Sequence, residues 1–398
     1  MNILHVITTL DVGGAEMHLL AQVRGQRARG HAVRVAYMKG RGSLAADITA
    51  AGAESVSRVG SGAALPWRLR RHIAWADLVH SHLLKADMAT AAIATSCGAR
   101  MRLVSSKHND EQVLKRSFVG FVHGLLGNLP QRTIVLSDHV GRFIAEHGRV
   151  KPDRLRRIYY GIDPAPFERA ASKGRDARDA LRASFGFGAD DVVLVCVARF
   201  APQKAHDVLL RAFARAREST RESTRELRGS PGTSGTELKL LLVGDDPFGD
   251  GRQRTEALAR ELDLGSACVF TGVRRDVPDL MAASDVFVMS SLWEGLGLVF
   301  LEAMATGLPV VSTRVSAIPE VVVDGETGLL VPPADDAALA DALVRLAREP
   351  ALRARLGAAG RARVRERFGL ERMIDETLAV YAEVLATGAL QSPAARIR

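Results

Sequence analysis

The sequence predicts an α/β protein built from two Rossmann-like domains. Short β-branched segments alternate with segments of helical periodicity along nearly all of the 398 residues. The strand candidates are continuously apolar, which is typical of parallel sheets covered by helices on both faces. They are too numerous for one such sheet, and a segment rich in Pro, Gly and charge divides them into two series.

The first series begins at the N-terminus. "MNILHVITTL" has neither the basic start nor the small-residue cleavage site of a signal peptide, so we interpret it as a buried strand. A helix is expected directly after it, at Ala15–Ala28. The strands expected in this half are Ile3–Ile7, Val33–Tyr37, Leu78–His80, Arg102–Ser105 and Ile134–Leu136.

The second series repeats the same alternation. Its helices are expected at Val208–Arg217, Thr255–Leu262 and Ala337–Arg348. The strands expected in this half are Val192–Ala198, Lys239–Val243, Val269–Phe270, Val286–Met289, Val310–Ser312 and Leu329–Val331.

The domain limits follow from the break between the two series. We place one domain at 1–165, a second at 166–369, and a closing segment at 370–398, in which Leu370–Ala386 is a lone amphipathic helix expected to pack across the domains. A tandem "RESTREST" repeat and a Gly/Ser/Pro/Thr stretch mark an insertion at about 218–236. Because the repeat alternates charge and has no apolar face, we expect it to extend a helix into solvent before a flexible loop.

Charge is unevenly distributed. Residues 1–165 contain 23 Lys and Arg against 12 Asp and Glu, whereas the remaining 233 contain 31 and 33. A one-sided basic field favours an anionic partner such as a membrane surface, nucleic acid or phosphorylated substrate, although a generally arginine-rich composition is the alternative. No recognisable nucleic-acid-binding module is present, so we expect no nucleic-acid partner.

Two further classes are disfavoured by composition. No apolar run approaches the roughly 20 residues that a membrane helix needs. Cys97, Cys196 and Cys268 lie far apart in apolar contexts, which predicts buried thiols in a reducing cytoplasm rather than a metal or disulfide framework.

Ligands of parallel sheets bind at the carboxyl ends of the strands. Gly13 and Gly14 follow the first strand and precede a helix, so their amides can approach a phosphate. The motif is not G-x-G-x-x-G, and no ribose-binding acid follows the next strand, which argues against a dehydrogenase. Farther on, Arg199 and Lys204 lie just before a helix, a pairing that suits a diphosphate, with ordinary surface charge as the alternative.

Two later strand ends can contact a nucleoside. Asp245 in "GDDPFG" can meet a base or ribose, and the backbone at Val273 in "TGVRRD" can pair with a base edge.

The stretch "WEGLGLVFLE" places Glu294 in a strand–helix loop and Glu302 in the second turn of the helix. Glycosidase carboxyls flank one bond from two sides at about 5–9.5 Å, an arrangement to which one loop and its helix are poorly suited. Gly295 and Gly297 let backbone amides approach a ligand without side-chain interference. We therefore expect the two glutamates to hold different hydroxyls of one extended ligand.

These segments together resemble the retaining GT-B glycosyltransferases of family 4 (glycosyltransferase group 1). The resemblance covers almost the whole chain and is most specific in the second half. It is carried by "GGAE", "DLVHSH", "SKHND", "YGIDPAPF", "ARFAPQK", "LLLVGDD", "FTGVRRDVPDLMAASDVFVMSS", "EGLGLVFLE" and "GLPVVSTRVSAIPEVVVDGETGLLVPPAD". It implies two Rossmann-like domains facing across a cleft and a C-terminal helix crossing back. The repeat segment departs from the family pattern.

The resemblance also implies a reaction. A sugar moves with retention from a nucleotide diphosphate sugar, with a UDP-sugar as the expected donor, to a glycan or lipid-linked acceptor in polysaccharide or glycolipid biosynthesis. Because no D-x-D triplet occurs, basic residues are expected to replace a metal, and no cofactor is expected. The alternatives are a nucleotide-sugar epimerase or hydrolase, and a catalytically silent sugar-nucleotide sensor.

Residue roles carry over from the family motif. Glu302 is expected to bind the ribose, Glu294 the transferred sugar, and Arg199 with Lys204 the diphosphate. His108 matches a histidine that contacts the sugar from the acceptor side. The remaining positions expected to contact the donor are Gly13, Gly14, Asp245, Val273, Leu296, Gly297 and Leu298.

Two more histidines follow a strand in "HSH". The spacing of His80 and His82 could suit a metal, but no further ligand cluster is near in sequence, so we expect a hydrogen-bonding role in the acceptor region or none.

Basic and apolar residues also gather at two helical segments of the first domain. One is "LPWRLRRHIAW", with Trp67 and Trp75 beside Arg68, Arg70 and Arg71. The other carries Lys115 and Arg116 beside an apolar stripe formed by Val113, Phe118, Phe121, Val122, Leu125 and Leu126. We expect a cytoplasmic protein attached peripherally to the inner face of a membrane, with core helices that have charged edges as the alternative.

Overall fold

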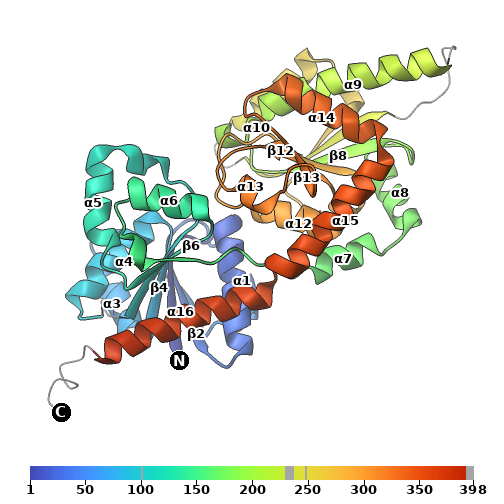
Figure 1. Cartoon of the computed structure of the whole chain (residues 1–398). Coiled ribbons are helices and arrows are strands. Elements are labelled where there is room, and N and C mark those ends of the chain that lie inside the picture. The colour runs from blue at the N-terminus through green and yellow to red at the C-terminus, as the bar shows by residue number, and fades with distance from the viewer. Residues whose placement is uncertain (100–101, 229–236, 247–248, 391–398) are drawn as a thin grey trace. The chain divides into compact units, whose positions relative to one another are not determined.

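The structure, a computed structural model, describes residues 1–99, 102–228, 237–246 and 249–390. The chain divides into two compact units (Figure 1). The first unit combines Met1–Ile162 with the segment that begins at Phe368, and the second unit spans Asp163–Arg367. Each unit has its own parallel sheet, which confirms the prediction of two Rossmann-like domains.

The sheet of the first unit has seven strands in the order β3-β2-β1-β4-β5-β6-β7, all paired in parallel. Its strands are β1 (Asn2–Thr9), β2 (Ala32–Lys39), β3 (Ser55–Arg58), β4 (Leu78–His82), β5 (Leu103–Lys107), β6 (Arg132–Val135) and β7 (Leu155–Arg157). The sequence analysis missed β3 and β7. Both are short edge strands without a buried apolar run, so their composition gave no strand signal.

Helices cover both faces of this sheet. They are α1 (Gly14–Ala28), α2 (Ala45–Ala50), α3 (Leu65–Trp75), α4 (Leu84–Ser96), α5 (Ser117–Gly127), α6 (Asp138–Glu146) and α16 (Leu370–Leu390), with short 3-10 turns η2 (Gln112–Lys115) and η3 (Pro152–Arg154). Alternate residues of β1 separate two cores: Ile3 and Ile7 pack with α1 and α16, whereas Leu4 and Val6 pack with α3 and α4. Helix α4 contacts both α3 and α5 on the second face.

Helix α16 packs on the first unit, although the sequence analysis had set residues 370–398 apart as a closing segment. A Cβ atom at Gly25 of α1 would lie 2.6 Å from Ile374, so the missing side chain allows close approach of the two helices. Arg29 forms ion pairs with Glu371 and Asp375 across the same contact. The tail 391–398 lies outside the described residues.

The second unit has six parallel strands in the order β10-β9-β8-β11-β12-β13. All six were expected from the sequence; their bounds are β8 (Val192–Val197), β9 (Leu238–Val243), β10 (Cys268–Gly272), β11 (Val286–Met289), β12 (Val310–Thr313) and β13 (Gly328–Val331). Buried apolar residues fill nearly every position of the central strands, as parallel sheets require.

Helices of the second unit follow the strands in turn. They are α7 (Ala165–Ala171), α8 (Arg175–Ser184), α9 (His206–Arg228), α10 (Gly251–Glu261), α11 (Val277–Ala282), α12 (Leu298–Thr306), α13 (Ile318–Val321), α14 (Asp336–Arg348) and α15 (Pro350–Arg367), with η4 (Pro202–Lys204) and η5 (Gly265–Ala267). Helix α9 continues through the "RESTREST" repeat, as expected. The rest of the expected insertion, 229–236, lies outside the described residues. Among the helices described, none combines the length and apolarity needed to cross a bilayer.

Candidate functional site

The strand order of the second unit brings two distant loops together. Strand β8 pairs with β11 although the chain passes through β9 and β10 between them, so the order reverses at this point. Open α/β sheets bind ligands at such a reversal, outside the carboxyl ends of the strands. The loop after β8 carries Arg199 and Lys204, and the loop after β11 carries Glu294.

Hydrogen bonds join these two loops directly. The Leu292 amide donates to the Gln203 carbonyl at 2.8 Å, and the Gln203 side-chain amide donates to the Trp293 carbonyl at 2.6 Å. The Ser290 hydroxyl donates to the Lys204 carbonyl at 2.9 Å. The backbone around Lys204 is therefore held by the neighbouring loop and does not depend on a bound ligand.

Lys204 and Glu294 form an ion pair between the loops. The two side chains are only 13% and 7% exposed, and the Ser291 hydroxyl donates to the same Glu294 oxygen at 2.7 Å. A buried charge of this kind requires a partner. An ammonium has three donors. One donates to Glu294 and a second to Sδ of Met289 at 3.8 Å, so one donor remains for an anion beside the weak sulfur contact.

Arg199 differs from Lys204 in its surroundings. Its side chain is exposed, and no hydrogen bond or ion pair joins it to another side chain in the described parts of the chain. Because the guanidinium is already accessible to solvent, its charge is available to an anion without breaking an internal contact.

Helix α12 begins beside Glu294. Its N-cap residue is Gly297, with φ 78° and ψ 86°, and no side chain caps the helix. A Cβ atom at Gly297 would lie 2.6 Å from the Phe300 ring, so glycine is required both by the conformation and by the space. The first amides of α12, from Leu298 on, therefore remain available to an anion at the positive end of the helix. Leu296 is fully buried beneath this turn.

Glu302 lies in α12 and is half-buried. Burial raises the pKa of this carboxyl from 4.5 to about 7. Its side chain has no hydrogen-bond partner within the described residues. A carboxyl that changes ionisation near neutral pH and has no internal partner is typical of a ligand-binding position.

The loops that follow β9 and β10 lie at the same edge of the sheet. The Phe200 amide donates to the Asp245 carbonyl at 2.8 Å, and the Gly244 amide donates to the Gly272 carbonyl at 3.0 Å. Asp245 is exposed, and Val273 is exposed over 62% of its surface. Asp245 and Val273, the two positions that the sequence analysis assigned to the nucleoside, are therefore both accessible to a ligand.

In the first unit, the glycine turn meets a carboxylate. Gly13 is the N-cap of α1, and Gly14 is exposed with no atom within 4 Å of the position of a Cβ. The Glu16 side chain turns back to the same terminus, where it accepts a hydrogen bond from the Thr9 hydroxyl at 2.6 Å. This negative charge lies where the sequence analysis expected a phosphate.

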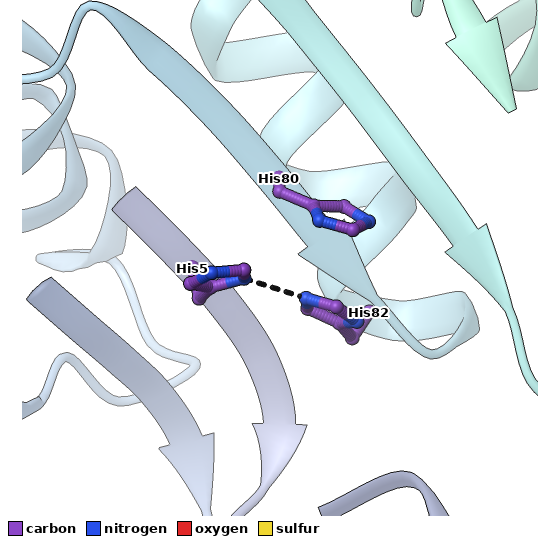
Figure 2. A group of neighbouring side chains, drawn as sticks. All are labelled: His5, His80 and His82. Carbon is purple, nitrogen blue, oxygen red and sulfur yellow. Dashed lines mark hydrogen bonds between the residues drawn. The ribbon is translucent and has the colours of Figure 1, made fainter. Parts of the chain in front are cut away.

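The three histidines that the sequence analysis singled out lie inside the first unit. His80 and His82 are fully buried in β4, and His108, which follows β5, is 8% exposed. A third strand histidine joins them, because His5 of β1 lies opposite His80 in the sheet register (Figure 2). The sequence analysis missed His5, since only the pairing of β1 with β4 brings it near.

These three strand histidines have the spacing of a metal site. Ligand atoms of His5, His80 and His82 all lie within 4.8 Å of one another. Each of their ring nitrogens is nevertheless hydrogen-bonded to a protein atom: His5 and His82 to each other, and the remaining four to Gln26, Tyr381, Ser106 and His108. The protein itself therefore accounts for every ring nitrogen.

Comparisons with known proteins agree with this architecture. Residues 177–363 match the model of glycosyl transferases group 1, and residues 12–166 match that of glycosyltransferase family 4. A D-inositol 3-phosphate glycosyltransferase of Saccharomonospora viridis is 34% identical over 78% of this chain and 70% of its own length. The N-acetyl-alpha-D-glucosaminyl L-malate synthase of Bacillus anthracis is 28% identical over 78% of this chain and 75% of its own.

Solved structures share the fold at lower identity. The crystal structure of Anabaena HepE in complex with UDP and glucose superposes with a TM-score of 0.82 at 22% identity, covering 96% of this chain and all of that one. WaaG, a glycosyltransferase involved in lipopolysaccharide biosynthesis, has a TM-score of 0.68 at 20% identity, covering 95% and 99%.

The two parallel-sheet units have the GT-B architecture of solved glycosyltransferase structures. The chain belongs to glycosyltransferase family 4, the glycosyl transferases group 1.

Proposed function

We propose that the chain is a retaining glycosyltransferase that moves a sugar from a nucleotide diphosphate sugar to a glycan or lipid-linked acceptor in polysaccharide or glycolipid biosynthesis. The observation that carries this proposal is the Lys204–Glu294 pair at the strand reversal, beside the uncapped start of α12. Cleavage of the anomeric bond leaves a nucleoside diphosphate with added negative charge. Preorganised cations and amides stabilise such charge.

The nucleotide that we propose first is UDP. Anabaena HepE was solved with UDP and with UDP-glucose, whereas a Mycolicibacterium smegmatis relative is GDP-mannose-dependent. A thermal-shift screen of UDP- and GDP-sugars tests the choice, because a ligand at 100 times its Kd stabilises by about 2.7 kcal/mol. The selected donor is then incubated with and without acceptors. Free sugar or an epimer formed without acceptor would favour the hydrolase or epimerase alternative, and binding without any product would favour the sensor.

We expect the transfer to be independent of divalent metal. Arg199 and Lys204 supply the positive charge that a metal supplies in other transferases, and the sequence contains no D-x-D triplet. Transfer activity measured in excess EDTA should equal that in its absence. Loss of activity with recovery on adding Mg²⁺ or Mn²⁺ would show that the two cations are insufficient.

Glu302 makes nucleotide affinity depend on pH. With a pKa of about 7, its carboxyl is largely protonated at pH 6 and ionised at pH 8. Ribose hydroxyls donate to the ionised form, so binding releases a proton and UDP affinity should rise about tenfold from pH 6 to pH 8. Calorimetry of UDP binding across this range measures the change.

Two glutamine variants isolate this effect from ionisation of UDP itself. Glu302→Gln should weaken UDP binding and remove the protein's share of the pH dependence. Glu294→Gln should keep the UDP affinity and its pH dependence. It should lose transfer activity, because the proposed contact of Glu294 is the sugar. Equal loss of UDP affinity in the two variants would contradict this division of roles.

We further propose a cytoplasmic protein that attaches peripherally to an anionic membrane through the layer formed by α3, α4 and α5 (Figure 1). Helix α5 exposes Phe118, Phe121 and Leu125 over 78%, 50% and 61% of their surfaces. Their spacing places them on one face of the helix. Apolar side chains in water beside basic groups are typical of an interfacial helix.

Basic residues border this apolar face. Lys115 and Arg116 are exposed just before α5, and the Arg149 guanidinium lies 5.9 Å from the Phe121 ring centre. On α3, Trp67 is 64% exposed, with the Arg71 guanidinium 5.2 Å from its ring. Each Lys or Arg near an anionic surface contributes about 1 kcal/mol, so three or four make binding measurable.

Sedimentation with vesicles tests this attachment. Wild-type protein should bind anionic vesicles more strongly than neutral ones, and less at high salt. Lys115→Glu with Arg116→Glu should reduce binding while leaving UDP affinity unchanged. The control is Arg24→Glu with Arg372→Glu, the same charge change on α1 and α16, which cover the opposite face of the sheet. Equal binding to neutral and anionic vesicles would contradict the electrostatic account, and no binding to either would indicate a soluble acceptor.

A further inference from the structure

A layer of polar side chains is buried between the sheet of the first unit and helices α1 and α16. Gln22, Gln26, His5, His80 and His82 are each exposed over 1% of their surface or less. Apolar residues normally fill this layer in a parallel sheet. Buried polar groups stabilise a fold only when they are hydrogen-bonded, so the partners of this layer decide what it can do.

One hydrogen-bond chain crosses the layer from α16 to β1. The Thr377 hydroxyl donates to the Met373 carbonyl at 2.8 Å. Its oxygen accepts from the Gln22 amide at 3.0 Å, and the Gln22 oxygen accepts from the Gln26 amide at 3.1 Å. The Gln26 oxygen lies 2.9 Å from Nε2 of His5. A carbonyl can only accept, so the chain runs in one direction and Nε2 of His5 carries the proton.

The same logic assigns every later proton. Nδ1 of His5 lies 2.9 Å from Nε2 of His82, which must donate. Nδ1 of His82 then accepts from Nε2 of His108 at 3.0 Å. Nδ1 of His108 accepts from the Tyr160 hydroxyl at 2.6 Å. All three histidines are thereby neutral, with the proton on Nε2.

Reversing the direction of these hydrogen bonds would be energetically costly. The amides of Gln22 and Gln26 would both have to turn over, and the Thr377 hydroxyl would have to give up the Met373 carbonyl. Tyr160 would also need another acceptor for its proton. His80 is not a member of this series, because its nitrogens bond Tyr381 and Ser106, but it is linked to it at one point: the Gln26 amide also donates to the Tyr381 hydroxyl at 3.3 Å.

We propose that this chain positions His108: Gln26, His5 and His82 hold its ring in the Nε2–H tautomer, with Nδ1 as the acceptor at the end of the chain next to Tyr160. Gln26 and His5 are positioning residues that act through His82. The functional part of this inference rests on the proposed glycosyl transfer, in which His108 is the histidine nearest the sugar. The structural part, the tautomer and its dependence on a distant residue, does not.

Nitrogen NMR of the full chain labelled with 15N-histidine measures the tautomer directly. In wild-type protein, His108 should show a protonated Nε2 and an unprotonated Nδ1. Gln26→Met removes the acceptor at the far end of the histidine chain without touching His108, and should produce a mixture of tautomers there. His82→Leu should do the same, and His82→Gln, which keeps a donor and an acceptor, should restore the single tautomer.

His80→Gln is the matched control. It alters an equally buried histidine in the same layer. His80 is linked through Tyr381 to the Gln26 amide, not to the Gln26 oxygen that fixes the tautomer of His5, so the His108 tautomer should not change. A protonated Nδ1 in wild-type His108 would overturn the proposal, as would an unchanged tautomer in both Gln26→Met and His82→Leu. Stoichiometric zinc on the purified protein would also overturn it, because a metal takes the lone pairs that the chain uses.

Activity separates the two parts. If transfer occurs as proposed, Gln26→Met should lower kcat about tenfold, because part of the protein would then present His108 to the sugar in the wrong tautomer, and should leave KM for the donor nearly unchanged. A mixed tautomer with unchanged kcat would confirm the chain and overturn its role in the reaction. If wild-type protein shows the assigned tautomer but no transfer, the proposed function is wrong and the series of hydrogen bonds from Gln26 to Tyr160 is still confirmed.

Discussion

Lys204→Ala is expected to lower kcat/KM by roughly 10²–10³, the loss measured when one preorganised charge-stabilising donor is removed. Lys204 lies at the strand reversal with its backbone bonded to the opposing loop and its ammonium on Glu294. These contacts hold the ammonium in place before any ligand arrives. An alanine removes both the charge that we propose to bind the diphosphate and the partner that holds Glu294.

The second consequence distinguishes Lys204 from Arg199. Without Lys204, Glu294 keeps only the Ser291 hydroxyl in a largely buried position. We therefore expect Lys204→Ala to lower thermal stability as well, since an unpaired buried charge is strongly destabilising. Arg199→Ala should lower kcat/KM by a similar factor and leave stability unchanged, because its side chain has no partner among the described residues.

Two further variants complete this test. Lys204→Arg should recover only part of the activity, because a planar guanidinium cannot replace a compact ammonium in a site of this size. Lys204→Ala combined with Glu294→Gln should recover stability but not activity, because the uncompensated charge is gone while the diphosphate contact is still missing. Near-normal kcat/KM in both alanine variants would remove these cations from the mechanism.

The contrast between Lys204 and Arg199 shows what sequence could supply. The alternation of strands and helices predicted both sheets, and the position of each residue after a strand predicted the edge at which it lies. The ion pair of Lys204 with Glu294 was not predicted, because the residues are 90 positions apart. Each had been expected to contact the donor, Lys204 at the diphosphate and Glu294 at the sugar. Only the pairing of β8 with β11 brings their loops together.

The contacts of the buried histidines in the first unit likewise depend on strand pairing that the sequence does not show. From their spacing on a strand, His80 and His82 were expected to have a hydrogen-bonding role in the acceptor region or none, but the spacing did not show that both side chains are buried. His5 and Gln26 carried no recognisable motif, so their part in the buried layer depends on strand pairing and on the packing of α1 and α16. Edge strands β3 and β7 were missed because a short, partly exposed strand contains no apolar run that would distinguish it from a loop.

The buried histidines make the first unit sensitive to acid. Desolvation lowers the pKa of His5 to about 4 and that of His108 to about 3, and lowers the pKa of His18, His80 and His82 well below 6.5. These groups are neutral in the folded protein at neutral pH. When the chain unfolds, their pKa values return to about 6.5, so below that pH the unfolded state binds more protons.

The sign of the effect follows. Stability is fully present above about pH 6.5 and is lost as the pH falls toward the folded pKa values. Between pH 7 and pH 5, His5 and His108 should each contribute a loss of roughly 2 kcal/mol in the free energy of unfolding. His18, His80 and His82 add losses of the same sign, because burial lowers their pKa values in the same direction. This total is a large fraction of the 5–15 kcal/mol that stabilises an ordinary domain.

Urea unfolding at pH 7, 6 and 5 measures this loss, and tryptophan fluorescence assigns it to a unit. Trp67 and Trp75 lie in the first unit and Trp293 in the second, so the Trp293→Phe variant reports on the first unit alone. Its midpoint should fall steeply between pH 6.5 and pH 5. Adding His5→Gln should lower stability at pH 7 and flatten the pH dependence, because one buried titrating group is gone and Gln keeps a donor and an acceptor. A midpoint constant from pH 7 to pH 5 would mean that the histidines titrate with the same pKa in the folded and the unfolded protein, which would contradict the lowering of their pKa values by burial.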